Sequence, residues 1–409
     1  MFDTRPTIRS LAVNQETWHH SWHDLFCTML PRAWPQRLPW GLLLAAGALL
    51  LVGWCGIARS EELADGEGRL LRHQVLCSLL AGAAVWLAAL PGYRVLRDYA
   101  YPLFGTTLVL LIAVYFFPAS HGAQRWIRLG SIGFQPSEIS KLVFVLALAR
   151  YLMRAENYRH FRGLVAPLAL TLVPVVLILR EPDLGTALVF FPLLFAMLYA
   201  AGARKTHLAA LALCGVAMLP VLWSQMSGEQ RSRVTALFEQ TGPEQAPSDD
   251  GYHLHQSKQM LALGGKRGSL WAGDFVLDRA VYQLPEDHTD FIFVVLVERL
   301  GWSGALAALL LEFGIVLAAM SIAARTREPF GRLTAIGIGT LFGVEAFINT
   351  AMTVGLLPVT GLSLPLLSYG GSGLLTHGVA LGLLVNISLR PGFEVGTMPF
   401  RFVQRGAAR

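Results

Sequence analysis

Charged side chains are scarce in this sequence of 409 residues. Asp, Glu, Lys and Arg make up 15% of it and hydrophobic residues 54%, whereas about a quarter of a soluble domain is charged. Cysteine is also rare: the four cysteines show neither disulfide nor metal-ligand spacing, so they do not indicate a redox compartment. The shortage of charge excludes a soluble globular chain and identifies an integral membrane protein.

Other features are absent too. The first 37 residues are polar and mixed, so we expect no cleaved signal peptide. No internal repeat and no segment with the two-residue period of a strand is visible. The net charge of +6 is spread over short loops between apolar segments, which favours a role in membrane topology over nucleic-acid binding.

Ten apolar windows have the length of a membrane-spanning helix, about 17–25 residues. They lie at 39–58, 73–91, 99–118, 138–153, 164–180, 184–201, 207–226, 300–324, 333–354 and 372–389. This pattern predicts an all-α polytopic protein with a ten-helix membrane domain at 38–390. Residues 227–290 then form a large extracytoplasmic loop between spans seven and eight, and tails at 1–37 and 391–409 flank the domain.

An even number of spans places both tails on one side of the membrane. Arg and Lys are more numerous in the short loops that share this side, which predicts that both termini are cytoplasmic. In the N-terminal tail, TWHHSWHDLFCTML has helical apolar spacing and predicts an interfacial helix. Its three histidines fit a solvated polar face better than a metal site.

Two polar stretches lie at predicted span ends. In QRWIRLGSIGFQPSEISK, residues 124–141, Arg125 and Trp126 form a cationic patch, and Glu138 and Lys141 share a helix face. They are either a membrane anchor with a neutralised ion pair or a surface for an anionic, polar substrate. In REPDLGTA, residues 180–187, Asp183 either caps the next helix or serves a site.

Two further stretches surround the large loop. Gly264 and Gly265 precede Lys266, Arg267 and Gly268, a flexible cationic loop suited to phosphate, but it lacks the context of a nucleotide-binding P-loop. In LPEDHTDFIF, residues 284–293, three acids and a histidine precede an apolar run too long for one span. We expect residues 291–298 to form a separate short helix, which Thr289 and Asp290 either cap or use to present a functional carboxylate.

The last stretch is GLLPVTGLSLPLLSYGGSGL, residues 355–374. It is apolar but contains proline and glycine residues that cannot continue a helix. Such backbone is tolerated at membrane depth only where protein buries it or where it lines a cavity. We predict a re-entrant loop before the last span, with an irregular helix connection as the alternative.

Together these stretches resemble the SEDS family (shape, elongation, division and sporulation proteins). The matching motifs are QRWIRLG, FQPSE followed by Lys141, PDLGTA, HQSK with a later GG, LPEDHTDFIF and GLLPVTGLSLPLLSYGGSG, in family order from about residue 121 onward. The FQPSE and QSK wording resembles RodA more than FtsW. The chain departs from the family pattern after Gly265, at Glu181, where glutamine is frequent, and in its longer N-terminal tail.

The resemblance implies a peptidoglycan glycosyltransferase of the bacterial inner membrane. Such a protein polymerises lipid II on its extracytoplasmic side, with a class B penicillin-binding protein as partner. Asp290 would be the general base and undecaprenyl pyrophosphate the leaving group, while Asp287 lies outside the motif match. The matched positions expected to contact substrate are Arg125, Trp126, Glu138, Lys141, Asp183, Gln256, Lys258, Glu286, His288, Thr289, Ser368 and Tyr369.

Several alternatives stay open. If Mg²⁺ or Mn²⁺ takes part, Asp290, Glu286 and Asp183 are the candidate ligands, because carboxylates are hard ligands. A division polymerase of the FtsW type, a lipid II flippase and a scaffold for another polymerase are the rival functions. The position of the carboxylates on the outer face, away from the bilayer midplane, favours the enzyme over a transporter.

Overall fold

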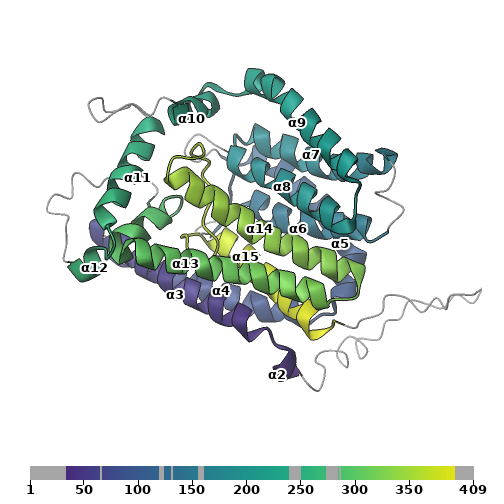
Figure 1. Ribbon diagram of the computed structural model, residues 1–409, viewed down its shortest axis with the longest axis horizontal. Helices are drawn as coiled ribbons and strands as arrows, with labels where there is room; N and C mark the ends of the chain where they lie inside the picture. Colours follow the sequence, from purple (N-terminus) through teal and green to yellow (C-terminus); the bar gives the residue numbers. More distant parts are fainter. Residues whose placement is uncertain are drawn as a thin grey trace, which may run out of the picture.

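The computed structural model describes residues 34–64, 67–118, 124–129, 132–154, 161–238, 250–272, 284 and 287–391. The predicted interfacial helix in the N-terminal tail lies outside these residues, as do most of the C-terminal tail and the middle of the 227–290 loop. Helices make up most of the described chain (Figure 1).

Each of the ten predicted windows coincides with a helix. Eight helices in the described residues are long and apolar enough to cross a membrane. They are α3 (Trp40–Leu63), α4 (Arg69–Ala89), α5 (Tyr93–Ala113, continued by η1, Val114–Phe116), α7 (Val165–Arg180, preceded by η3, Phe161–Leu164), α8 (Leu184–Ala201), α13 (Ile292–Arg325), α14 (Pro329–Thr353) and α15 (Gly371–Leu389). The other two windows correspond to α6 (Pro136–Leu152), which is short and more charged, and α9 (Lys205–Gln225). The prediction of an all-α polytopic fold is confirmed.

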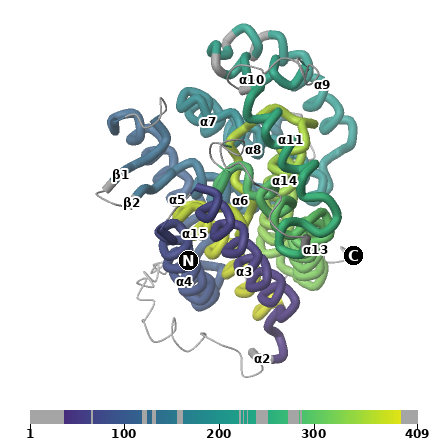
Figure 2. Tube along the Cα trace, turned by 90° about the vertical axis from the view of Figure 1, so that its left-hand side faces the viewer, coloured from purple at the N-terminus to yellow at the C-terminus, as the bar shows by residue number. Residues whose placement is uncertain are grey.

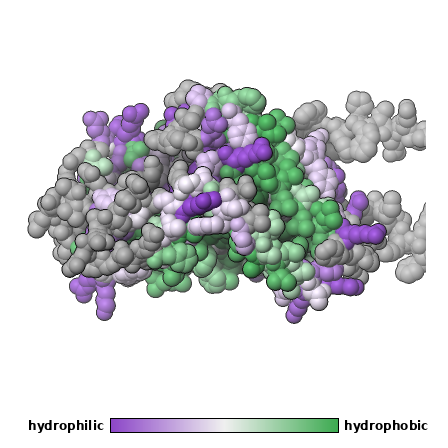
Figure 3. All heavy atoms as spheres, turned by 90° about the horizontal axis from the view of Figure 1, so that it is seen from above, coloured by the Kyte–Doolittle hydropathy of each residue, from purple (hydrophilic) through white to green (hydrophobic). Residues whose placement is uncertain are grey.

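The outer surface of the bundle is apolar. Leu44, Leu79 and Leu87 are each more than 60% exposed (70%, 65% and 67%). In Figure 3, hydrophobic side chains cover a large part of the visible face, and hydrophilic ones lie toward its two ends and in a small group near its middle. A soluble monomer does not expose apolar surface on this scale, so this belt is the lipid-facing surface of a multi-pass membrane protein.

The centre of the bundle is formed by α6, α14 and α15. Within their spanning windows, 67% of α14 and 78% of α15 is buried, against 22% of α4. Helices α6 and α15 lie between α3 and α4 on one side and α7 and α8 on the other (Figures 1 and 2). Glycine allows the closest approach: a Cβ atom on Gly378 or Gly382 would lie 2.6 or 2.4 Å from a carbonyl oxygen of α4.

Helix α13 consists of two helices that meet at Gly301, which has φ 72°. Ile292 and Leu296 pack near Gly56 of α3, and Glu298 pairs with Arg59 one turn further along α3. The first part of α13 therefore follows α3 in α3's own direction, and the spanning part begins after Gly301. This confirms the predicted short separate helix.

Most of the described part of the 227–290 loop is helical. It contains α10 (Gly228–Phe238), α11 (Asp250–Gly264) and α12 (Ser269–Ala272), at the edge of the bundle in Figure 1. Gly264, Gly265 and Gly268 pack on the break in α13, and the Gly265 carbonyl accepts a hydrogen bond from the Trp302 amide at 3.0 Å. Lys266 and Arg267 remain exposed. The glycine-rich segment 264–268 therefore packs against α13 in addition to exposing two positive charges.

Two short elements were not predicted. Helix α2 (Trp34–Arg37) precedes the first span, and β1 (Ile127–Leu129) pairs antiparallel with β2 (Ile132–Phe134), with Arg128 opposite Gly133. Strands of three residues are too short to show the two-residue period by which a strand is recognised in a sequence.

The apolar loop, residues 355–370, connects α14 to α15 without a regular helix. Leu362, Leu364, Leu366 and Leu367 in it are buried. Close contacts hold it from both sides: a Cβ atom on Gly53 of α3 would lie 2.7 Å from the Leu367 oxygen, and one on Gly185 of α8 2.5 Å from the Thr360 oxygen. The predicted non-helical backbone buried in protein is therefore present.

Candidate functional site

Asp290 ends a turn, residues 287–290, that we call the acid turn. Its side chain is half-buried beside the apolar loop: a Cβ atom on Gly361, where φ is 72°, would lie 3.5 Å from Asp290 Oδ2. The N-cap residue of α13 is Phe291, which cannot cap through its side chain. The structure therefore does not place Thr289 or Asp290 at the N-cap position, the alternative that the sequence left open.

Three hydrogen bonds fix the backbone of the acid turn. The Asn349 side chain donates to the Asp290 carbonyl at 2.8 Å. Ser368 Oγ donates to the Thr289 carbonyl at 2.6 Å, and the Tyr369 amide to the His288 carbonyl at 2.8 Å. All three acceptors are main-chain oxygens, so none of these three bonds uses the Asp290 carboxylate.

The side chains of Asn349 and Ser368 also hold the apolar loop. Asn349 also donates to the Leu362 carbonyl at 2.6 Å, and Ser368 Oγ accepts the Leu364 amide at 2.7 Å. Leu366, between these anchors, has φ 59°, a left-handed conformation that costs a non-glycine residue energy and persists only where its surroundings enforce it. The acid turn and the apolar loop are therefore built as one unit.

Tyr369 joins two histidines at this site. Its ring lies between those of His73 and His288, with centroid distances of 5.5 and 5.3 Å, and its hydroxyl is 3.1 Å from His73 Nδ1. Burial raises the pKa of Tyr369, so the hydroxyl stays neutral. His288 Nδ1 lies 3.1 Å from Asp287 Oδ1, which gives Asp287 an orienting contact that the motif comparison did not anticipate.

Helix α11 brings the HQSK motif to the end of α14. Ser257 Oγ donates to the Thr353 carbonyl at 2.7 Å. The Lys258 side chain lies along Gly355, where an added Cβ atom would be 2.7 Å from Lys258 Cε, and Gln256 donates to the Tyr252 hydroxyl at 3.0 Å. The motif therefore contacts the start of the apolar loop.

Asp183 is a helix cap. Its carboxylate accepts the Thr186 amide at 3.0 Å and the Thr186 hydroxyl at 2.9 Å at the start of α8. The Gln135 side chain approaches it at 3.4 Å. The capping interpretation of Asp183 is confirmed, and the cap faces the beginning of α6.

Arg125 and Trp126 lie beside this cap. Arg125 donates to the carbonyls of Glu181 (2.9 Å) and Pro182, and the Trp126 ring packs near Gly133 of the hairpin. The Glu181 carboxyl is fully buried without a hydrogen-bond partner. Burial and the nearby Asp183 carboxylate raise the pKa of Glu181 to about 8, against the effect of Arg125.

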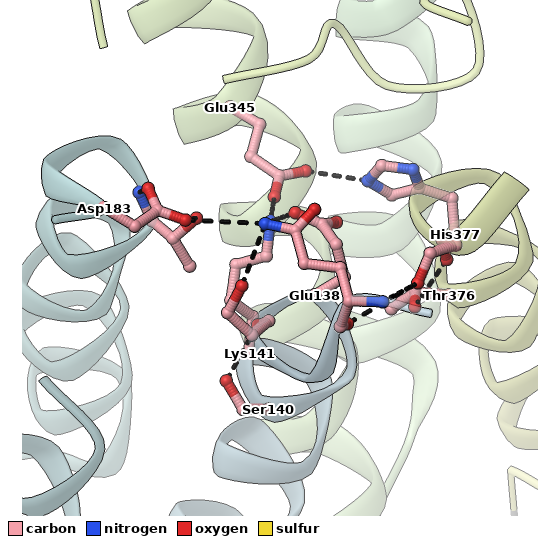
Figure 4. Close-up of polar contacts among 11 residues, drawn as sticks. Glu138, Ser140, Lys141, Asp183, Glu345, Thr376 and His377 are labelled. Carbon is pink, nitrogen blue, oxygen red and sulfur yellow. Dashed lines mark hydrogen bonds and ion pairs between the residues drawn. The ribbon is translucent and has the colours of Figure 1, made fainter. Parts of the chain in front are cut away.

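The predicted pair of Glu138 and Lys141 belongs to a larger buried ion network. Lys141 Nζ lies 2.8 Å from Glu138 Oε1 and also binds Glu345 of α14. The second oxygen of Glu345 is 2.7 Å from His377 Nε2 of α15 (Figure 4). Lys141 is 1% exposed, so the predicted ion pair is present and deeply buried.

The structure thus gathers the predicted residues into two groups. His288, Thr289, Asp290, Ser368 and Tyr369 meet at the acid turn, while the residues from Arg125 to Asp183 in the predicted set surround the starts of α6 and α8. Gln256 and Lys258 belong to neither group and lie on α11, which contacts the start of the apolar loop. Glu286 lies outside the described residues. Sequence reasoning missed Asn349, Glu345 and His377, although a polar residue inside an apolar window is the signal that identifies such positions.

Among the described residues, no three His, Cys, Asp or Glu side chains are placed to hold a metal ion. Both Asp183 oxygens accept hydrogen bonds from protein groups, and Glu286, another candidate ion ligand, lies outside the described residues.

Comparisons with known proteins agree with this architecture. The model of a family described as "Cell cycle protein", which groups FtsW, RodA and SpoVE, matches residues 36–391. The probable peptidoglycan glycosyltransferase FtsW of Geobacter sulfurreducens is 34% identical over 357 residues, 85% of this chain and 92% of the relative. The peptidoglycan glycosyltransferase MrdB of Escherichia coli K12 is 38% identical over 296 residues, 72% of this chain and 79% of the relative.

Solved structures resemble the chain as well. One chain of a peptidoglycan synthase complex, described as coordinating polymerization and crosslinking, superposes with a TM-score of 0.72 at 29% identity and covers 85% of this chain and 97% of its own length. RodA of Thermus thermophilus gives a TM-score of 0.64 at 28% identity, covering 87% of this chain and 98% of its own length.

Proposed function

Because the chain belongs to the FtsW/RodA/SpoVE family, we propose that it is a peptidoglycan glycosyltransferase that polymerises lipid II into glycan strands. The observation that carries this proposal is the family match over nearly the whole bundle, with relatives named as peptidoglycan glycosyltransferases at 34% and 38% identity. The site supports it, because the Asp290 carboxylate of the acid turn lies beside a buried apolar loop, as a substrate that is part sugar and part lipid requires.

Asp290 is the proposed general base. The sugar 4-hydroxyl of the acceptor attacks the anomeric carbon of the donor; the new C–O bond forms, the bond to the phosphate oxygen breaks, and the hydroxyl proton passes to Asp290. Such positioned proton transfer contributes about 10²–10⁴-fold to the rate. Undecaprenyl pyrophosphate leaves without protonation, so a second carboxylate acting as an acid is not needed, in contrast to glycosidases.

The cations near the site have separate proposed roles. Lys258, beside the start of the apolar loop, is placed to stabilise charge on the leaving pyrophosphate. Lys141 is buried between two carboxylates and instead organises the bundle beneath the site. The proposed orientation puts both termini in the cytoplasm and the acid turn on the extracytoplasmic side.

The proposed partner is a class B penicillin-binding protein. The similar chain comes from a peptidoglycan synthase complex that is described as coordinating polymerization and crosslinking. This supports pairing with a transpeptidase. We also propose a role in elongation, because the FQPSE and QSK motifs resemble those of RodA more than those of FtsW. Overall identity does not separate the two roles, since the FtsW and MrdB relatives are 34% and 38% identical to this chain. Rescue of rod shape in RodA-depleted cells, without rescue of FtsW-depleted cells, is the expected result.

Reconstitution tests the function. The purified chain, with and without the penicillin-binding partner, is incubated with lipid II, and glycan strands are separated on gels. We expect strands, more of them with the partner present. Absence of polymer under both conditions, combined with intact lipid II translocation in liposomes, would instead identify a flippase. If the purified chain neither polymerises nor translocates lipid II but stimulates another polymerase, it would be a scaffold.

A further inference from the structure

Glu312 is a buried acid that the proposed reaction does not use. It lies in the spanning part of α13, well past the break at Gly301. The residue is 2% exposed, and neither carboxyl oxygen has a hydrogen-bond partner. An unpaired carboxylate in such a place costs several kcal/mol, so the group needs either a proton or a cation.

The packing of α13 against α14 places Glu345 opposite Glu312. A Cβ atom on Gly339 would lie 2.9 Å from the Ala319 side chain, and one on Gly343 3.4 Å from that of Val316. These contacts define an antiparallel register in which residue numbers on the two helices change in opposite directions. Glu312 lies one helical turn before Val316 on α13, and this register places it level with Glu345 on α14. The two carboxyl groups interact electrostatically.

Glu345 is already fully engaged. One of its oxygens binds Lys141 and the other lies 2.7 Å from His377 Nε2. The positive charge of Lys141 is in turn shared with Glu138 at 2.8 Å. Within the described residues, Lys141 thus serves two carboxylates, and no hydrogen bond from this network reaches the Glu312 oxygens.

Charged groups on the other elements packed against α13 lie near its first part. Helix α3 carries charge only at Arg59, Glu61 and Glu62, and Arg59 binds Glu298 at 2.9 Å. Helices α11 and α12 approach α13 near Val297 and Gly301. On α15 the titratable neighbour is His377, which faces Glu345.

We propose that Glu312 is a proton-binding site inside the membrane-spanning bundle, kept occupied by the adjacent, doubly bonded Glu345 carboxylate. The ligand is a proton and the neutral carboxylic acid is the resting form. Loss of this proton would place a second negative charge next to the Glu345 carboxylate. This site is independent of the proposed glycosyltransferase function.

Dicyclohexylcarbodiimide provides the probe, because it reacts with protonated carboxyl groups in apolar surroundings. The carboxyl oxygen bonds to the carbodiimide carbon, the proton moves to a carbodiimide nitrogen, and rearrangement leaves a stable acylurea. The full-length protein in lipid nanodiscs is labelled at neutral pH and its peptides are analysed by mass spectrometry. We expect an adduct at Glu312 that is absent from Glu312→Gln.

Glu61 is the matched control. It is 5% exposed, but its oxygens accept the amides of Leu70 and Leu71 at 2.6 and 3.1 Å. Glu61 is thus buried like Glu312 but hydrogen-bonded, and we expect no adduct there. Infrared spectra of the wild type minus Glu312→Gln should contain the carbonyl stretch of a protonated carboxyl. If this band is missing at neutral pH, or if Glu61 and Glu312 are labelled equally, the proposal is wrong.

Discussion

The acid turn and the buried ion network both place carboxylates among apolar side chains, but they hold them differently. The acid turn is fixed through main-chain carbonyls, by Asn349, Ser368 and the Tyr369 amide. The network is fixed through the charged groups themselves, with Lys141 bound to Glu138 and Glu345. Replacement of a charged side chain should therefore change mainly chemistry in the first region and folding in the second.

The largest expected effect on activity follows from Asp290→Asn. The amide cannot accept the proton of the sugar hydroxyl, so polymerisation should fall by about 10²–10⁴-fold. The anchoring bonds go to the main chain, so the thermal midpoint should stay within about 2 °C of the wild type. Gel analysis of strands and a thermal melt of the same sample measure both. A large fall in the midpoint would show that the carboxylate itself holds the turn.

Lys141→Met should produce the largest effect on stability. It leaves Glu138 and Glu345 buried without their shared cation, and breaking such a pair costs about 3–5 kcal/mol. Unfolding in detergent monitors the change, with the exposed Lys205→Met as control, expected within about 0.5 kcal/mol. Equal stability of the two variants would contradict the role given to the network.

Ser368→Ala tests the link between the acid turn and the apolar loop. It removes the acceptor of the Leu364 amide and the donor to the Thr289 carbonyl, which should cost about 1–3 kcal/mol. Activity should fall as well, because Asp290 follows Thr289 directly. Ser303→Ala, which removes an exposed hydroxyl bond to the Lys266 carbonyl, should be nearly silent. A Ser368→Ala variant that is fully active and fully stable would contradict the claim that Ser368 links the acid turn to the apolar loop.

A further expected effect depends on pH and concerns Glu181, whose pKa is raised to about 8 by burial and by Asp183. A raised pKa means that the folded state binds the proton more tightly than the unfolded chain. The free energy of unfolding is then highest below the ordinary glutamate pKa of about 4.3 and falls as the pH rises toward 8. Glu181→Gln should flatten this part of the curve of thermal midpoint against pH, whereas the exposed Glu67→Gln should not. Parallel curves for Glu181→Gln and the wild type would refute the assignment.

Much of the architecture could be predicted because lipid imposes a simple length rule. The apolar windows located the helices, and the proline and glycine residues of 355–374 located the one long non-helical apolar connection. The short helix before Gly301 followed from an apolar run too long for a single span. Local sequence was enough to predict each element whose features all lie in one continuous segment.

The tertiary pairs could not be predicted in the same way. Lys141 is separated from Glu345 by 204 positions in the sequence, so its i, i+3 partner Glu138 was visible and Glu345 was not. Asn349 lies in an apolar window, and only the fold shows that it bonds both the acid turn and the apolar loop. For Asp183, spacing alone left a cap and a binding role open, and the geometry around Thr186 identified the cap.

One measurement tests the central claim most directly: the initial rates of lipid II polymerisation by Asp290→Asn and Asp287→Asn in one reconstitution with the partner. Both variants lose one carboxylate from the same turn, and Asp287 contacts only the His288 ring among the bonds described for its side chain. We predict that Asp290→Asn loses about 10²–10⁴-fold and that Asp287→Asn keeps its rate within about tenfold. Equal rates for the two variants would contradict the assignment of Asp290 as the base.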